Sequence, residues 1–438
     1  MTRAKLRDMV LASPLRSRVR QLTATSIGNV VEWYDWLTYA FLSTYFADQV
    51  IPASNHAASL LGTFAVFAVG FVMRPVGGLV IGLISDRYGR RTAMTLTILL
   101  MGIGQLMMVV LPTYEQVGLL SPILLVVSRL VQGFSVGGEF AVSSVFLVES
   151  ATPGRRGLYS SMSYFSSNLG QLLASGIAAL FSNLLSRADM LSWGWRMPFL
   201  IGAVTCLSGL WIRSGTHETY ALAEAIKQGR AERPRMWDFL RHHPRESLLV
   251  VGMTIGATVS FYTWSVYLPS YAETTAGTDP AQSLLATTIA LAFFTVIQPV
   301  GGLLSDRIGR KPMLVVFGIG FTLLTVPLLS LLDRSFWSLL WISCVAMLLL
   351  TGYTAVCSAV MSELFPAKVR TAGLGMPYSA TVALFGGTAP YVATAFIDAG
   401  HTALFGWYAT LLMLISTLVY IGMRETKDVV LEVAGAEA

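Results

Sequence analysis

Long apolar segments, separated by short polar loops, follow one another along almost the whole sequence. A helix that crosses the hydrocarbon core of a bilayer, about 30 Å thick, needs roughly 20 mostly apolar residues. Many of the segments contain Gly or Pro, which membrane helices tolerate. The pattern predicts twelve transmembrane helices, at residues 23–48, 57–84, 92–111, 119–148, 157–186, 196–213, 247–272, 282–304, 312–332, 336–363, 371–398 and 402–424. The predicted fold class is therefore an all-α polytopic membrane protein.

The composition also indicates a membrane protein. Of the 438 residues, 54% are apolar and only 12% are charged, whereas soluble domains carry about 25% charged residues. The three cysteines, Cys206, Cys344 and Cys357, lie in apolar segments, and their spacing matches neither a disulfide framework nor a metal site. We therefore expect three buried free thiols, and the sequence predicts neither a metal nor a cofactor.

The basic residues predict the orientation of the chain. Most of the 30 Lys and Arg residues fall in the two termini and in alternate loops, while the other side holds only Arg187, Arg334 and, at the edge of a span, Arg196. Because basic loops stay on the cytoplasmic side, both termini are predicted to be cytoplasmic, and no signal peptide precedes the first span. A basic cytoplasmic rim accounts for the net charge of +6, so no nucleic-acid partner is expected.

Two loop motifs occur twice. Residues 82–91 read Gly-Leu-Ile-Ser-Asp-Arg-Tyr-Gly-Arg-Arg, residues 302–311 read Gly-Leu-Leu-Ser-Asp-Arg-Ile-Gly-Arg-Lys, and each follows Pro-Val-Gly-Gly. A Glu–Pro–Arg set recurs in the loops near residues 150 and 365. The rule for basic loops explains the arginines, but neither the shared spacing nor the repeated glutamates. The chain is thus predicted to be a duplicated bundle, an arrangement typical of transporters that bind substrate near the midplane.

The duplication predicts five parts of the chain. They are a cytoplasmic N-terminal segment (residues 1–22), a six-helix bundle (23–213), a cytoplasmic linker (214–246), a second six-helix bundle (247–424) and a short cytoplasmic tail (425–438). The charged loop residues are interpreted as latches that hold one conformer and break in the other. We expect Glu149 to cluster with Arg155 and Arg156, and Glu363 with Arg370. The candidate gate residues are Asp86, Arg90, Glu149, Arg156, Asp306, Arg310, Glu363 and Arg370.

Five ionisable residues fall inside the predicted spans: Glu32, Asp35, Arg74, Arg129 and Glu139. Such a group costs about 2.5–3.5 kcal/mol on insertion scales, so it usually meets a partner or lines a cavity. Glu32 and Asp35 share one helix face, and the antiparallel course of the first and fourth spans lets Asp35 meet Arg129. A fixed ion pair that only pins the helices is the alternative. Two acids opposite one base, however, leave a carboxylate free to bind a proton.

The fifth span carries Tyr164, Asn168, Gln171 and Ser175 at steps of four, three and four residues. This spacing places them on one polar stripe, as expected for the wall of a cavity, although hydrogen bonding between helices is an alternative. Tyr262 and Tyr378, in the second bundle, are candidates for the opposite wall, with aromatic packing as their alternative role.

Six motifs together resemble one transporter family. They are Gly28-Asn-Val-Val-Glu-Trp-Tyr-Asp35, Met73-Arg-Pro-Val-Gly-Gly78, the loop from Asp86 to Arg91, the segment from Arg129 through Gln132 to Glu139, Trp193-Gly-Trp-Arg-Met-Pro, and Glu363-Leu-Phe-Pro-Ala-Lys-Val-Arg370. The set is similar to the metabolite:proton symporters of the major facilitator superfamily, over roughly residues 20–425. Phe261-Tyr-Thr263 and Phe385-Gly-Gly387 resemble the members that carry 2-oxoglutarate.

The resemblance implies a functional monomer in a bacterial inner membrane that imports 2-oxoglutarate or a related dicarboxylate with protons, by rocker-switch alternating access. Citrate, shikimate, an aromatic acid and a zwitterionic osmolyte are alternative cargoes, and a passive facilitator is an alternative mode. An enzyme or a sensor is not expected, because the loops carry no catalytic pattern and no signalling domain.

The same resemblance suggests roles for the membrane charges. Arg129, with Gln132, is expected to grip a substrate carboxylate, because a guanidinium can donate two parallel hydrogen bonds. Arg74 is a second substrate cation or part of the gate. Asp35 is the expected proton carrier, with Glu32 as an accessory, and Arg129 holds Asp35 ionised until substrate competes for it.

Overall fold

The computed structural model of the protein describes residues 15–88, 90–136, 139–149, 154–214, 241–366 and 369–427, together with 151, 152 and 429. These residues form helices and no strand. The side chains of Asp86, Arg90 and Glu139, which were candidates above, lie outside the described part of the chain.

The first half of the chain contributes six long helical segments. They are α2 (Leu15–Val50), α3 (His56–Tyr88), α4 (Arg90–Val109), α6 (Leu120–Val136) followed by α7 (Glu139–Glu149), α8 (Arg156–Leu184) and α10 (Arg196–Ser214). The short elements α5 (Tyr114–Val117), α9 (Arg187–Asp189) and the π-helical turn η1 (Met190–Gly194) lie in the connections. Helix α2 begins before the predicted start of its span, because the helix continues into the polar segment.

The second half contributes six more. They are α13 (Pro244–Tyr262) with η2 (Thr263–Tyr267) and α14 (Leu268–Thr275), α15 (Pro280–Ile308), α16 (Arg310–Ser330), α17 (Phe336–Thr354) with α18 (Cys357–Leu364), α19 (Arg370–Thr381) with η3 (Val382–Gly386) and α20 (Ala389–Asp398), and α21 (Thr402–Gly422). The prediction of twelve helical spans in two sets of six is confirmed in the described residues.

Seven of these segments are, within the described residues, long and apolar enough to cross a membrane, and three shorter apolar helices accompany them. Helix α8 is not one of these seven segments, because its serines, Asn168 and Gln171 interrupt the apolar sequence and lower its hydropathy. Large apolar side chains such as Leu248, Val296 and Leu323 point outward and are about two-thirds exposed. In a bilayer these side chains face lipid, which accounts for an apolar outer surface.

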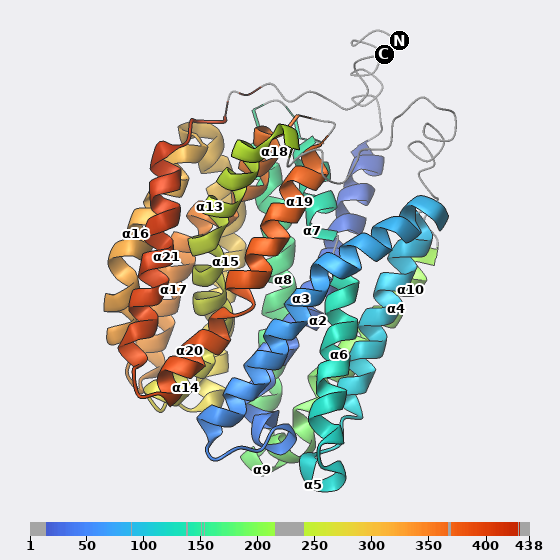
Figure 1. The fold of residues 1–438 in the computed structure, drawn as a ribbon, viewed down its shortest axis with the longest axis vertical. Helices are drawn as coiled ribbons and strands as arrows, with labels where there is room; N and C mark the ends of the chain where they lie inside the picture. The colour runs from blue at the N-terminus through green and yellow to red at the C-terminus, as the bar shows by residue number, and fades with distance from the viewer. Residues whose placement is uncertain are drawn as a thin grey trace.

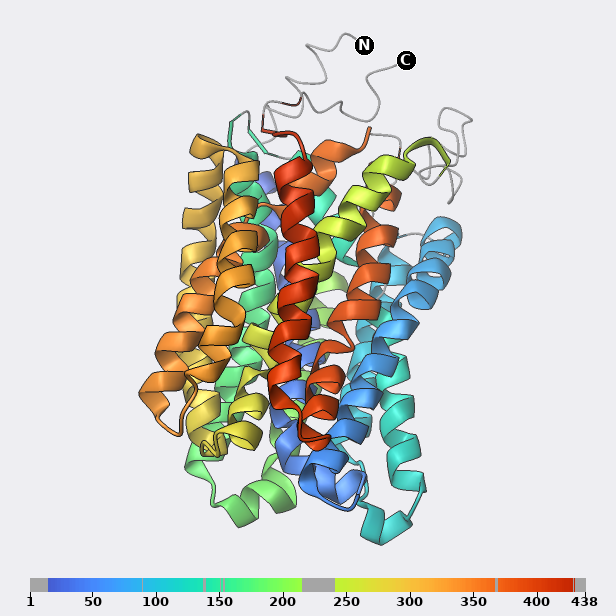
Figure 2. The same cartoon turned by 60° about the vertical axis from the view of Figure 1, so that its left-hand side comes forward.

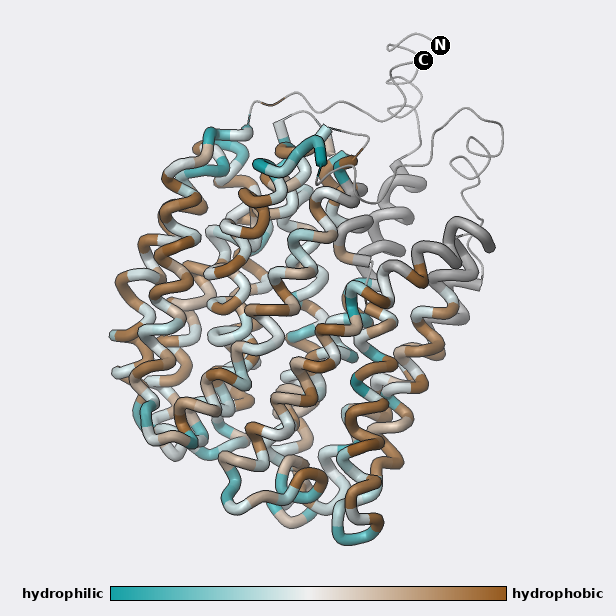
Figure 3. The backbone as a smooth tube through the Cα atoms, viewed as in Figure 1, coloured by the Kyte–Doolittle hydropathy of each residue, from teal (hydrophilic) through white to brown (hydrophobic). Residues whose placement is uncertain are grey.

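The long helices run along the same axis, and helices of the two halves lie side by side in the middle of the molecule (Figures 1 and 2). Hydrophobic residues follow the outer helices, while hydrophilic residues gather towards the ends (Figure 3). Helix α8 packs along both α2 and α15, so it joins the halves. A Cβ atom at Gly302 of α15 would lie 2.6 Å from the carbonyl oxygen of Gly157 of α8, so only glycine permits this approach.

Candidate functional site

A buried network of four polar side chains lies inside the first half. Asp35 comes from α2, Gln105 from α4, and Arg129 and Gln132 from α6, and all four are fully buried. The Oδ1 atom of Asp35 accepts hydrogen bonds from the side-chain amides of Gln105 and, at 3.2 Å, Gln132. The side-chain oxygen of Gln132 accepts one from Arg129 at 2.5 Å. Gln132 therefore connects the acid to the base.

The expected meeting of Asp35 and Arg129 is thus indirect. The described residues show no ion pair between the two side chains, and a second amino group of Arg129 donates to the backbone carbonyl of Trp36 at 3.4 Å. Gln132 follows Arg129 by one turn on the same helix face, so its amide fills the space between the charges. An amide can accept from a guanidinium and donate to a carboxylate at the same time.

Aromatic rings enclose the two arginines. The guanidinium of Arg129 lies over the rings of Trp36 at 4.3 Å, Tyr39 at 4.4 Å and Phe67 at 5.4 Å. The guanidinium of Arg74 also lies 4.3 Å from the Trp36 ring. A cation above an aromatic face is attracted by about 0.5–2 kcal/mol. Trp36 therefore holds two cations next to one another at the same ring.

Glu32 and Arg74 are directed towards the second half. Glu32 lies one turn before Asp35 on α2 and is buried, while Arg74 is half-buried. Both interact electrostatically with the hydroxyl group of Tyr262 on α13, and Arg74 also interacts with that of Tyr378 on α19. The predicted site residues of the second half are thus close to those of the first.

The polar stripe of α8 also meets the second half. The hydroxyl groups of Tyr164 and Tyr378 are 3.1 Å apart, and the amide of Gln171 donates to the backbone carbonyl of Ser265 in η2. The hydrogen-bonding alternative for this stripe therefore holds for Tyr164 and Gln171. Asn168 differs, because neither polar atom of its buried amide has a hydrogen-bond partner among the described residues.

Several buried polar atoms around this interface lack a partner in the described part of the chain. An unpaired buried polar group costs about 1–3 kcal/mol, so each of these atoms needs a partner from outside the chain, such as a water, an ion or a ligand. The atoms are both amide atoms of Asn168, Oε1 of Gln171 and Oγ1 of Thr263.

Two π-helical turns border the interface. The turn η2 directly follows Tyr262, and η3 ends at Gly386. A Cβ at Gly386 would lie 2.8 Å from the ring of Tyr262, and one at Gly387 would lie 2.5 Å from the ring of Phe71. The two glycines therefore let this part of the second half reach both α13 and α3. Single π turns inside helices are frequent at functional sites.

Ion pairs join the halves at one end of the molecule, which we name the latch end. A guanidinium nitrogen of Arg370 contacts Oε1 of Glu149. Glu363 is paired with Arg156 at 3.4 Å and with Arg310 at 3.8 Å. The sequence predicted clusters within each repeat, of Glu149 with Arg155 and Arg156 and of Glu363 with Arg370. The observed pairs instead join the two halves, Glu149 with Arg370 and Glu363 with Arg156. Corresponding ends of the two repeats face each other, so each glutamate meets the arginine of the other repeat.

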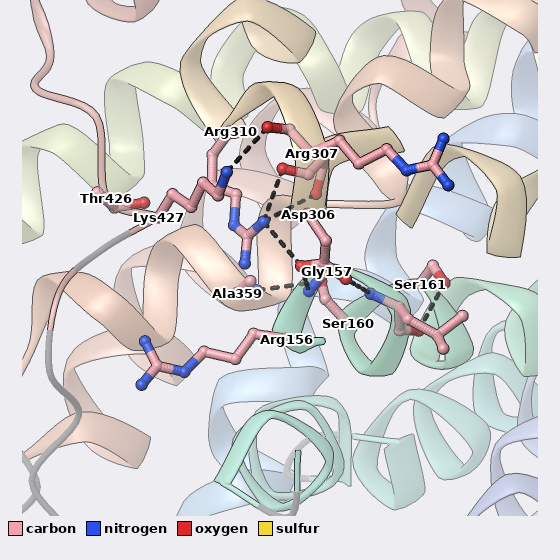
Figure 4. Close-up of polar contacts among 12 residues, drawn as sticks. Arg156, Gly157, Ser160, Ser161, Asp306, Arg307, Arg310, Ala359, Thr426 and Lys427 are labelled. Carbon is pink, nitrogen blue, oxygen red and sulfur yellow. Dashed lines mark hydrogen bonds and ion pairs between the residues drawn. The ribbon is translucent and has the colours of Figure 1, made fainter. Parts of the chain in front are cut away.

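Asp306 adds a second kind of contact at the latch end (Figure 4). Its carboxylate accepts hydrogen bonds from the backbone N–H groups of Gly157 at 2.7 Å and Leu158 at 3.0 Å. These N–H groups belong to the first turn of α8. The N–H groups of a first turn have no acceptor within their own helix. Arg310 holds the same carboxylate at 3.0 Å. An acid of the second half thus caps a helix of the first.

The segment after α21 extends the latch. The Glu425 carboxylate accepts from the backbone N–H groups of Arg310 at 2.8 Å and Lys311 at 3.0 Å, and Thr426 donates to Glu363 at 2.6 Å. Partial burial alone would raise the pKa of the Glu425 carboxyl, but the backbone N–H donors hold it below its usual range. Arg156 of the first half donates to the carbonyl of Val429 at 2.6 Å.

The halves also touch at the opposite end. The rings of Phe64 in α3 and Tyr267 in η2 meet edge to face at 5.2 Å, and Asn55 donates to Asp398 at 3.4 Å. Arg196, at the edge of a predicted span, lies over the ring of Trp195 at 4.1 Å and donates to the carbonyl of Leu111 at 2.9 Å. Arg196 therefore stabilises a connection within the first half.

The sequence did not point to Gln105, Trp36 or Glu425. A glutamine in the middle of the third span was a signal for Gln105, because a buried amide requires partners. Trp36 follows Asp35 directly, but aromatic residues are too common in membrane helices to single it out. For Glu425 no sequence pattern predicted the contact with a loop more than 100 residues earlier.

Comparison with known proteins places this geometry in a family. The family model described as Major Facilitator Superfamily matches residues 25–286 and 253–436. The chain belongs to this superfamily. Its twelve helices in two halves have the corresponding fold, and the crystal structure of a D-xylose-proton symporter superposes with a TM-score of 0.73, at 18% identity, over 94% of this chain and 99% of that one.

Curated relatives at higher identity are transporters. The alpha-ketoglutarate permease of Escherichia coli (strain K12) is 38% identical over 93% of this chain and 94% of its own length. The citrate-proton symporter of Klebsiella pneumoniae is 33% identical over 89% and 88%. The glycine betaine/proline/ectoine/pipecolic acid transporter OusA of Dickeya dadantii is 30% identical over 97% and 86%. This major facilitator protein is therefore a membrane-embedded transporter and not an enzyme.

Proposed function

We propose that this protein is a proton-coupled symporter of a small organic anion, 2-oxoglutarate or a related dicarboxylate. The observation that carries the proposal is the buried Asp35–Gln132–Arg129 chain, in which one amide holds the acid and the base apart. A closed ion pair would have to break before either group could react. In the observed arrangement Asp35 and Arg129 each bond the amide of Gln132, so either residue can change its hydrogen-bond partner without an ion pair being broken first.

The mechanism follows from competition for Arg129. A substrate carboxylate binds the guanidinium, with its two parallel donors, better than the neutral oxygen of Gln132 does. The substrate also brings a negative charge near the buried Asp35, which favours the protonated form of Asp35. Proton binding and anion binding therefore support each other, as coupling requires. Gln132 stays close to both groups and acts as the link between them.

Charge compensation supports an anion as the cargo. In their ordinary ionised forms, Glu32 and Asp35 balance Arg74 and Arg129, so the central charges of the first half sum to zero. A dicarboxylate would leave two excess negative charges in this poorly solvated interface. Protons on Asp35 and Glu32 would remove this excess, because a net charge at membrane depth is costly. A zwitterion adds no net charge and would need no proton for this purpose.

The aromatic residues argue against an osmolyte such as betaine. A quaternary ammonium group is recognised by free aromatic faces. Here the ring of Trp36 already meets the guanidinium groups of Arg74 and Arg129, and that of Tyr39 meets Arg129. The similarity to the alpha-ketoglutarate permease and to the citrate-proton symporter also supports an organic acid. The relative OusA, named for betaine and proline, keeps the osmolyte as the competing cargo.

Conformational change would use the ends described above. We infer that the latch end faces the cytoplasm of a bacterial cell, in the inner membrane, and that a single chain transports. Substrate-driven rocking of the two halves breaks the pairs at Glu149, Asp306 and Glu363 and opens that end. Asn168, Gln171, Tyr164, Tyr262 and Tyr378 would orient the part of the substrate that Arg129 and Arg74 do not hold.

The test is counterflow of labelled 2-oxoglutarate in proteoliposomes. Succinate and citrate should compete, and shikimate and betaine should not. If betaine alone competes, the proposed cargo is wrong and the protein carries a zwitterion, not an anion. Coupling is tested separately with the pH indicator pyranine inside the vesicles. Substrate added outside should acidify the lumen, and counterflow without any acidification would leave a passive facilitator.

A further inference from the structure

Gln105 is the side chain of the charged network that the mechanism has not used. It reaches Asp35 from α4, the helix that begins at the gate candidate Arg90, and it is fully buried. Its amide nitrogen donates to Oδ1 of Asp35 and, at 3.2 Å, to the backbone carbonyl of the same residue. A Cβ at Gly202 of α10 would lie 2.9 Å from Cδ of Gln105, so the fold leaves space for this amide and no more.

Both amides that reach Asp35 donate to the same oxygen. Gln132 must present its nitrogen to Asp35, because its oxygen accepts from Arg129. Gln105 must do so because a carboxylate only accepts hydrogen bonds. Oδ1 is thus occupied twice. Oδ2 of Asp35 and Oε1 of Gln105 are both buried, and neither has a partner among the described residues.

This pattern is half of an acid–amide pair. A carboxylic acid and a primary amide can form two parallel hydrogen bonds, one from the amide N–H to the acid carbonyl and one from the acid O–H to the amide oxygen. The first bond is present here, from Gln105 to Oδ1. A proton added to Oδ2 would supply the second, with Oε1 of Gln105 as its acceptor.

Among the described residues, the titratable neighbours of Asp35 are poorly suited to accept that proton. The titratable groups that interact with Asp35 are Tyr34 on its own helix, Arg129 on α6 and Cys206 on α10. The hydroxyl of Tyr34 donates to the carbonyl of Pro198 at 2.6 Å, and Arg129 has no acceptor atom. A thiol is only a weak acceptor. The amide oxygen of Gln132 already accepts from Arg129, whereas that of Gln105 on α4 has no donor among the described residues.

We propose that Gln105 positions the proton-binding carboxyl group: its N–H donates to Oδ1 of the carboxylate, and its oxygen accepts the proton carried on Oδ2 of Asp35. This inference rests on the proposed role of Asp35 as the proton carrier. Gln105 would then stabilise Asp35 in both protonation states without turning its side chain. Gln132, by contrast, would lose its bond from Arg129 when substrate binds that guanidinium.

The test is pH-difference infrared spectroscopy of the full-length protein in lipid. Lowering the pH should produce the carbonyl band of a protonated carboxyl group, and Asp35→Asn should remove this band. In Gln105→Met, which keeps the length of the side chain, the band should persist at higher frequency, because the acid O–H no longer donates to the amide. Gln105→Asn, with an amide too short to reach, should shift the band in the same direction and serves if the methionine variant does not fold.

Gln298→Met is the matched control. Gln298 is an equally buried amide of the second half that bonds Thr354 at 2.8 Å, and it precedes the same Pro-Val-Gly-Gly motif as Arg74 does. The control should leave the band unchanged. An unshifted band in both Gln105 variants, or an equal shift in the control, overturns the role of Gln105 and leaves Asp35 as the carrier. A band that survives Asp35→Asn removes the carrier itself, and the role of Gln105 with it.

Discussion

Asp306 offers a direct measure of how firmly the latch end is closed. The perturbation is Asp306→Asn. The carboxylate accepts two N–H bonds from the first turn of α8, at 2.7 and 3.0 Å, and these bonds exist only while the halves are together. Its bond to Arg310 lies within the second half. This bond is present in both the closed and the open state, so it does not change the free-energy difference between them.

The magnitude follows from helix capping. Loss of a capping side chain costs about 0.5–2 kcal/mol, and loss of a negative charge at a helix N-terminus costs about 0.3–1 kcal/mol. Asparagine keeps one acceptor oxygen, so we expect a weakening of about 1–2 kcal/mol. This corresponds to an increase of about 5–30-fold in the population that is open at the latch end.

The assay is the rate at which a maleimide labels Cys357, in a protein whose other two cysteines are replaced by serine. Cys357 is fully buried at the start of α18 and lies next to Tyr164 of the first half, so opening of the latch exposes it. Labelling should accelerate about tenfold in Asp306→Asn. Asp398→Asn, which removes a negative charge at the opposite end, is the control and should not accelerate it. Equal rates in all three proteins would refute the capping argument.

Three further predictions concern the charges. Asp35→Asn should retain 2-oxoglutarate counterflow but lose accumulation driven by a pH gradient, and concentrative uptake by this variant would contradict the role of Asp35. Arg129→Lys should lower uptake at least about tenfold, because an ammonium group lacks the two parallel donors that grip a carboxylate; uptake at the level of the unmodified protein would exclude that grip. Glu425→Ala should release residues 423–427 from α16 and make this segment more accessible to protease. Since the folded-state pKa of Glu425 is lowered, its contribution should be present at neutral pH and be lost only as the pH falls below the usual range of a glutamate, which protease protection measured against pH will show.

The fold was predictable from the sequence because its main signals are local. Each span is a run of apolar residues whose transfer into lipid depends on that run alone, and the repeated loops at 82–91 and 302–311 revealed the duplication. Helix α8 shows the limit of this rule. Its polar stripe lowered its hydropathy, yet Tyr164 and Gln171 of this stripe contact the second half.

The charged residues of the candidate site stood out in the sequence, but their connections did not. Charges inside apolar spans are expensive, so Asp35, Arg129 and Arg74 stood out without any structure. Which atoms meet could not be read from spacing, because Gln132 lies one turn from Arg129 on the same face of α6. The amide took the position between them, and Gln105 joined from a helix that the charge pattern had not marked.

The sequence by itself determined that the chain lies in a membrane, that it is built twice, and which costly side chains it buries there. Only the tertiary structure decided the pairing across the two repeats, as in Glu149 with Arg370 and Glu363 with Arg156, and the docking of Glu425 on α16. The hydropathy of a span is a sum over residues that are adjacent in the sequence, so it follows from the sequence alone. A duplicated sequence offers each glutamate an equivalent arginine in both repeats, and only the packing of the halves selects one of them.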